Sequence, residues 1–352
     1  MRSTYSLLAL GALALAACTA PDGVAPSDVS LAASSATLDF PEDDGSNPDM
    51  ARVAALVDRI NDRLARGGSK LRVDEVSMFT VGRGTDPFRR LRTGSRWANP
   101  NVTYMIKESR ILATAPNGAP APSRTVGQTV AEIVKGWEVW NGVGSTLRLT
   151  RIPDAGGNID VLDAMWLRTV PAPTPANPNA TAEVCDDVVD LGPGTRVTSY
   201  NPPNDINFTP AADNVFGGWL DPRYFALCLG SGNIIGVTWS FSDVDSENDG
   251  DRYRDRLYTE MFYNPRFRWV TAGSPFLSSV MDVSTIVAHE AGHAHGLGHF
   301  GGPNANQPFK LQPNGRVFDP EAVMNPFYIG GTKYQPLPSD VAATRALYQS
   351  DR

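Results

Sequence analysis

The sequence predicts an α+β or β-rich fold for a chain of 352 residues. Apolar residues make up 41% of the chain and charged residues 20%, which is ordinary for a globular protein with a buried core. The 32 glycines and 28 prolines indicate long irregular connections and argue against a helical bundle. The length suits about two domains, or one large domain with appendages.

The balance of charge argues against one class of partner. The chain has 31 Lys and Arg against 38 Asp and Glu, a formal net charge of -7. No segment gathers its basic residues into the stripe that binds a phosphate backbone. We therefore expect no nucleic-acid partner.

The N-terminus has the anatomy of an export signal. Arg2 supplies positive charge, and residues 7–17 form an apolar run that is too short to span a bilayer. We therefore predict a signal peptide at residues 1–17 and an exported protein. The run ends in Leu-Ala-Ala-Cys, which resembles the lipobox of bacterial lipoproteins. That resemblance implies lipidation of Cys18, a membrane contact through the lipid anchor only, and a place on the outer membrane or cell surface. The alternative is a secreted protein in which Cys18 is incidental.

Two segments precede the main domain. Residues 18–49 are rich in Ala, Ser, Pro and Asp without periodicity, which is typical of a flexible tether. Residues 50–90 form an N-terminal helical extension in which apolar residues recur at helical spacing before Gly67. These residues are Val53, Leu56, Val57, Ile60 and Leu64.

Residues 91–352 are predicted to form the main domain. Apolar periodicity favours a helix that starts near residue 126 and ends near residue 142, with its tryptophans in the core. A Pro- and Asn-rich insertion covers about residues 170–217. Short β-prone runs predict strands at residues 102–106, 146–150, 158–162, 235–241 and 259–263.

Two cysteines remain beyond the predicted signal, Cys185 and Cys228. In an oxidising compartment such a pair more often forms a disulfide than two free thiols. The alternative is two buried thiols, because the spacing guarantees nothing about geometry.

The segment that follows Asp282 carries the strongest chemical signal. Asp282 is a good N-cap, and the residues after it contain no proline for more than three helical turns. His289 and His293 therefore lie on one face of the predicted helix, at the spacing that a zinc ion needs. Glu290 is predicted to act as the general base on a zinc-bound water.

The motif continues beyond the helix. Gly296 can adopt the left-handed backbone that turns the chain back, and His299 then supplies a third ligand. The string from His289 to His299 satisfies the extended pattern HExxHxxGxxH. The remaining histidine, His295, is two residues from His293, and we expect a solvent-facing or hydrogen-bonded imidazole there instead of a ligand.

This motif resembles that of the metzincin zinc metalloproteases. The segment Val-Met-Asn-Pro-Phe-Tyr downstream resembles the metzincin Met-turn, with Met324 beneath the metal. Pro326 and Tyr328 match the matrixin segment that walls the pocket for the residue after the scissile bond. The resemblance implies a metzincin-type α+β catalytic domain with a mixed, twisted five-stranded sheet, an active-site helix and a C-terminal helix.

The resemblance covers residues 91–352 apart from the insertion. By the family's strand order, residues 235–241 would be an exposed edge strand that pairs with an extended substrate. Matrixins usually hold a second zinc through further histidines and often block the catalytic zinc with a propeptide cysteine, and this chain has residues for neither. The extension at residues 50–90 is interpreted as a spacer or a packed element, and the alternative is a prosegment over the cleft.

An acidic run raises the question of calcium. Asp243, Asp245, Glu247 and Asp249 place carboxylates at every second position, a density that Ca²⁺ favours. The alternative is a solvated turn, since the run lacks the closing glutamate of an EF-hand.

These observations favour a monomeric zinc metalloendopeptidase that acts on a protein or peptide substrate. Zn²⁺ is the expected cofactor and Ca²⁺ an optional one. The second hypothesis is a non-catalytic zinc-containing surface binding or adhesion protein, and the third is a structural lipoprotein without zinc. The intact Glu290 favours the enzyme over both.

Overall fold

A computed structural model provides the coordinates, and it describes residues 50–66, 68–81, 89–90, 95–111, 126–154, 166–186, 212–243, 245–246, 253–271, 280–299, 322–325, 327–328 and 330–348. The predicted signal peptide, Cys18, the tether at residues 18–49 and the strand at residues 158–162 lie outside these ranges. Within them, no helix has both the length and the apolarity to cross a bilayer.

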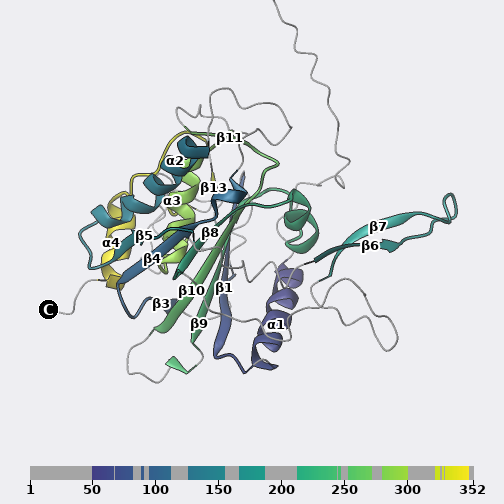
Figure 1. The fold of residues 1–352 in the computed structure, drawn as a ribbon, viewed down its shortest axis with the longest axis horizontal. Helices are drawn as coiled ribbons and strands as arrows, with labels where there is room; N and C mark the ends of the chain where they lie inside the picture. The colour runs from purple at the N-terminus through teal and green to yellow at the C-terminus, as the bar shows by residue number, and fades with distance from the viewer. Residues whose placement is uncertain are drawn as a thin grey trace, which may run out of the picture. The chain divides into compact units, whose positions relative to one another are not determined.

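The fold is α+β, built on a mixed sheet (Figure 1). The main path of the sheet runs β13-β1-β9-β10-β8-β4-β5. β10, β8, β4 and β5 are mutually parallel, and β9 is antiparallel to both of its neighbours. In chain order these strands are β1 (Leu71–Val81), β4 (Asn101–Ile106), β5 (Arg148–Arg151), β8 (Asn214–Trp219), β9 (Ile234–Asp243), β10 (Arg254–Tyr263) and β13 (Phe327–Tyr328).

Shorter strands complete the list. β2 (Arg89–Arg90) pairs with β1, and β3 (Ser95–Arg96) pairs with β10. β6 (Trp166–Pro171) and β7 (Thr181–Asp186) form an antiparallel pair, and β11 (Arg268–Val270) and β12 (Val280–Asp282) form a parallel one.

The described residues include four α-helices. They are α1 (Met50–Arg66), α2 (Val126–Glu138), α3 (Val283–Ala294) and α4 (Pro338–Tyr348). Single turns follow β4 (Glu108–Arg110), follow α2 (Val139–Gly142) and precede β9 (η4, Tyr224–Cys228). The helices predicted near residues 50–64 and 126–142 are thereby confirmed.

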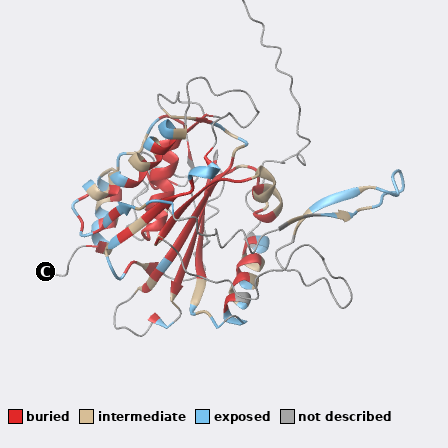
Figure 2. Ribbon diagram, viewed as in Figure 1, coloured by how far each residue is buried: buried red, intermediate tan, exposed pale blue. Residues whose placement is uncertain are grey.

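The strands divide their side chains between two apolar clusters. In β4, Tyr104 and Ile106 belong to one cluster and Met105 to the other, as the alternation of a strand requires. We call the first the α3-face cluster, because it contains the buried side chains of α2 and α3. The second, the α1-face cluster, contains those of α1. Both faces of the sheet are therefore covered, and its central strands are buried (Figure 2).

Three expectations need correction. The sheet has more strands than the five expected, because β1 and β13 extend it beyond β9. β9 is therefore no exposed edge: it pairs with β1 on one side and β10 on the other. The predicted insertion also ends too late at residue 217, since β8 begins at Asn214 and is buried between β4 and β10.

The helical extension is more than a spacer. α1 and β1 belong to the same compact unit as the rest of the described chain. The Asn61 side chain donates from Nδ2 to the carbonyl of Val73 at 3.0 Å, and its Oδ1 accepts from the Val73 amide at 2.7 Å. These bonds join α1 to β1, and β1 in turn joins the sheet.

Candidate metal centre

α3 begins where its sequence predicts. The Asp282 carboxylate accepts hydrogen bonds from the backbone amide of Thr285 at 2.9 Å and from its hydroxyl at 2.7 Å. This cap satisfies an amide that the first turn leaves without a helical partner. All twelve residues of α3 are buried.

Three histidines converge at the C-terminal part of this helix. The Nε2 atom of His289 lies 3.0 Å from that of His299 and 3.1 Å from that of His293, and the last two are 3.1 Å apart. His289 and His293 are buried, and His299 is half-buried. The chain turns back between the helix and His299 at Gly296, whose φ of +104° favours glycine.

Hydrogen bonds on the other ring nitrogen fix the direction of two imidazoles. His289 Nδ1 lies 2.7 Å from the carbonyl of Val323, and His293 Nδ1 lies 2.8 Å from that of Leu297. A carbonyl can only accept, so each Nδ1 carries the proton and each Nε2 is left as a lone-pair donor. Burial lowers the pKa of both imidazoles well below the ordinary value, which favours the neutral form.

The triad has the dimensions of a metal site. Ligand nitrogens about 2.0–2.1 Å from a tetrahedral zinc are about 3.3 Å apart, close to the separations found here. Imidazole nitrogens accept several transition metals, so the donor set does not by itself identify the ion. Among the described residues, these three histidines form the group that could hold a metal.

Glu290 lies beside the triad in a closed environment. Its side chain is buried, and its Oε2 accepts a hydrogen bond from the Thr238 hydroxyl on β9. Within the described part of the chain, its Oε1 has no hydrogen-bond partner. Burial raises the pKa of Glu290 to about 8. An orphaned carboxylate oxygen on the residue next to His289 fits a site that receives a polar ligand such as water.

Two neighbours of Glu290 were not anticipated from the sequence. A Cβ on Gly236 of β9 would lie 2.7 Å from Glu290 Oε1, so a larger residue there would require the carboxylate to shift. A glycine inside a strand pattern indicates a close approach of this kind. Nothing in the sequence marks Thr238, because its partner is 52 residues away.

Met324 packs against α3. It is fully buried, and its sulfur is 2.2 Å from the position that a Cβ on Gly292 of α3 would take. Asp340 of α4 accepts from the amides of Val323 at 3.0 Å and Met324 at 3.1 Å. The carboxylate of Asp340, which sequence reasoning missed, thus holds the Met324 turn against α4.

Tyr328 is anchored through its hydroxyl. The oxygen lies 3.0 Å from the carbonyl of Val280 and 2.9 Å from that of Gly331, and it accepts from the Asp282 amide at 3.2 Å. This ties β13 to the start of α3. Pro326, the other predicted wall residue, lies outside the described ranges.

His295 is not part of the triad. It is buried, not solvent-facing, and its ring stands edge-on to Trp140 with centroids 4.6 Å apart. Burial lowers its pKa to about 3, so the imidazole is neutral.

The acidic run is only partly described. Asp243 accepts from the amide of Asp245 at 2.8 Å, and the carboxylate of Asp245 pairs with Lys70 at 2.7 Å. Glu247 and Asp249 lie outside the described ranges. The described carboxylates therefore form a capped turn and an exposed ion pair, and calcium binding stays a prediction.

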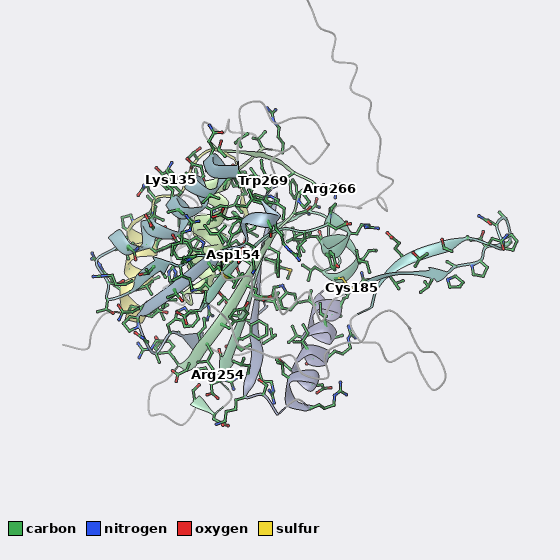
Figure 3. The ribbon with its side chains drawn as sticks, in the orientation of Figure 1. Lys135, Asp154, Cys185, Arg254, Arg266 and Trp269 are labelled. Carbon is green, nitrogen blue, oxygen red and sulfur yellow. A yellow bond between two sulfur atoms is a disulfide. The ribbon has the colours of Figure 1, made fainter. Side chains whose placement is uncertain are left out.

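The two cysteines are joined. Cys185 and Cys228 form a disulfide with Cα atoms 5.1 Å apart, which links β7 to η4 (Figure 3). Cys228 is buried in the α1-face cluster, so the bond attaches the β6–β7 pair to the core.

Comparison with known protein families and with curated proteins finds no match for this chain.

Proposed function

We propose that this chain is a zinc-dependent metalloendopeptidase that resembles the matrixin-type metzincins. The observation that carries the proposal is the convergence of the three Nε2 atoms of His289, His293 and His299 within 3.1 Å beside the buried Glu290. The family assignment rests on the HExxHxxGxxH string and on Met324 packed against α3. The sheet supports it too, since four parallel strands end in antiparallel β9 next to α3.

In the proposed reaction, each residue of the site has a separate role. His289, His293 and His299 would hold the ion. A bound Zn²⁺ supplies Lewis-acid chemistry, because it polarises a carbonyl and lowers the pKa of water towards about 7. Glu290 takes a proton from the attacking water and delivers it to the leaving amine as the peptide bond breaks. The Thr238 hydroxyl donates a hydrogen bond to Glu290 Oε2. The other carboxylate oxygen, Oε1, therefore remains available to accept that proton.

Two variants test the proposal. Glu290→Gln should keep zinc bound, as measured by elemental analysis, and lose about a hundredfold or more in kcat on a peptide library read by mass spectrometry. His293→Ala should lose the zinc. Glu260→Gln is the matched control, because Glu260 of β10 is equally buried and accepts from Tyr258 at 2.6 Å. It should keep both zinc and cleavage.

Two results would contradict the proposal. Cleavage that survives in Glu290→Gln would remove the assigned base. Zinc bound without cleavage by any form would favour the second hypothesis, a surface protein that binds zinc and does not turn over.

Export and lipidation are part of the same proposal. They rest on the residues around Cys18 alone. Labelling of the expressed protein with an azide-bearing fatty acid should depend on Cys18 and vanish in Cys18→Ser.

A further inference from the structure

β1 lies where an extended substrate would lie in the proposed enzyme. It pairs antiparallel with β9, the strand expected to receive substrate, and parallel with β13, which contains the expected pocket wall. Phe79 stands opposite Gly236 of β9, and Val81 stands opposite Tyr328 of β13. A segment paired on both sides in this way fills a β-augmentation site completely.

The side chain of Phe79 reaches the candidate metal centre. Its ring stacks on the imidazole of His289 with centroids 3.7 Å apart and an interplanar angle of 7°. The ring of Tyr328 stands edge-on to it at 6.1 Å. Phe79 is 3% exposed and belongs to the α3-face cluster. It therefore occupies the space between a predicted metal ligand and the expected wall of the pocket.

β1 also pairs with the part of β9 that approaches Glu290, the proposed general base. Gly236, the partner of Phe79, is the residue on which a Cβ would lie 2.7 Å from Glu290 Oε1. The pairing shifts by one residue directly after Phe79, as in a β-bulge. The strand thus passes the predicted metal ligand, the predicted base and the expected pocket wall, and its Phe79 side chain contacts the first and the last of these.

The other side of β1 is held by the core. Val76 and Met78 belong to the α1-face cluster, against the buried face of α1. The Asn61 bonds to Val73 add polar contacts from α1, and the buried ion pair between Glu75 and Arg256 holds the strand from the α3 side. A free peptide would need to displace this strand before it could pair with β9.

We propose that β1 is an intramolecular occupant of the substrate cleft, with Phe79 in the place of the residue that follows the scissile bond. The intact chain is then autoinhibited, and the cleft prefers an aromatic residue at that position. This inference rests on the proposed function for the meaning of the cleft.

A binding experiment tests the occupancy without turnover. The probe is N-acetyl-L-phenylalanine hydroxamate, which offers a metal-binding group and one phenyl ring, titrated calorimetrically into the zinc-loaded full chain. Phe79→Ala should bind it about tenfold or more tightly than the parent, because the open state is more populated. The matched control is Phe216→Ala, which removes an equally buried phenylalanine of the same cluster from β8 and should bind like the parent.

A second variant covers the case in which the alanine variant does not fold. Phe79→Val keeps an apolar, strand-compatible side chain and should bind the probe a few-fold more tightly than the parent. Equal affinity in the parent and in the folded Phe79 variants would overturn the inference.

Cleavage profiling separates this inference from the proposed function. Phe79→Ala should cut a peptide library faster than the parent, with aromatic residues enriched after the cut. Rapid cleavage by the parent, unchanged in Phe79→Ala, would overturn the occupancy and leave the proposed function intact. Tighter probe binding without cleavage by any form would support the occupancy and contradict the proposed function.

Discussion

Glu75 and Arg256 form an ion pair that is closed off from solvent. Glu75 Oε2 lies 2.9 Å from Arg256 Nη2, and the two side chains are 3% and 0% exposed. Arg256 also donates to the Ser95 hydroxyl and to the carbonyl of His293. The pair therefore connects β1 and β10 with the last turn of α3, the helix that contains His289 and His293.

Loss of Glu75 should destabilise the fold strongly. Glu75→Ala leaves the Arg256 charge buried without its carboxylate, and removal of one partner of such a pair costs about 3–5 kcal/mol. The free energy of unfolding in urea measures this. Asp245→Ala is the control, because it breaks the exposed pair with Lys70 and should leave the urea midpoint unchanged. A similar decrease in the free energy of unfolding in both variants would contradict the prediction.

The stability of the metal-free protein should depend on pH through Glu290. Burial raises the pKa of this carboxyl from 4.5 to about 8. Below about pH 4 it is protonated in both states, and as the pH rises the unfolded chain ionises first, so the folded state loses about 1.4 kcal/mol per unit. Glu290→Gln does not ionise. The free energy of unfolding of the variant should exceed that of the parent by about 3 kcal/mol at pH 7 and by almost nothing at about pH 4.

Urea unfolding at several pH values in the presence of a chelator measures this difference. A gap between parent and variant that stays constant across that range would show that Glu290 ionises normally in the fold.

A methyl group on Gly236 should disturb the base without removing the metal. Gly236→Ala would place its Cβ 2.7 Å from Glu290 Oε1 and force the carboxylate to move. A displacement of this size costs about tenfold to a hundredfold in kcat. Gly142→Ala is the control, since nothing lies within 4 Å of its Cβ position. Zinc content should be normal in both variants, and equal activity would refute the contact.

The disulfide should contribute to the stability of the whole unit. Cys185 and Cys228 are separated by 43 positions, and closure of a loop of that length stabilises by about 4 kcal/mol in the chain-entropy model. The double variant Cys185→Ser with Cys228→Ser should therefore melt at a lower temperature, as should the parent in a reductant. A melting temperature insensitive to reductant would contradict this.

The candidate metal centre could be predicted because the residues that determine it are close together in the sequence. One helix carries His289, Glu290 and His293 within two turns. Asp282 caps the same helix by accepting from Thr285, only three positions away in the sequence. The spacing alone therefore brings the side chains to one face. The same local signals predicted α1, α2 and four strands of the main sheet path, β4, β5, β9 and β10.

β1 could not be predicted because its stability is non-local. Its sequence contains Asp74 and Glu75, which are unfavourable in a buried strand. The structure compensates them with Ser242, which donates to Asp74 at 2.7 Å, and with Arg256, 181 positions from Glu75. β13 was missed for a related reason, since a strand of two residues has no period to detect.

The position of β9 between β1 and β10 also sets the order in which the sheet can be assembled. Residues of β1 and β9 that pair, such as Val76 and Trp239, are far apart in the chain, and β13 follows still later. During synthesis β1 therefore forms before its partner strands exist, and Val76 and Met78 can then pack only against α1. Such long-range closure is slow, and an unpaired apolar strand is prone to aggregate. The strand proposed to occupy the cleft is thus also one that needs protection from aggregation until the fold is complete.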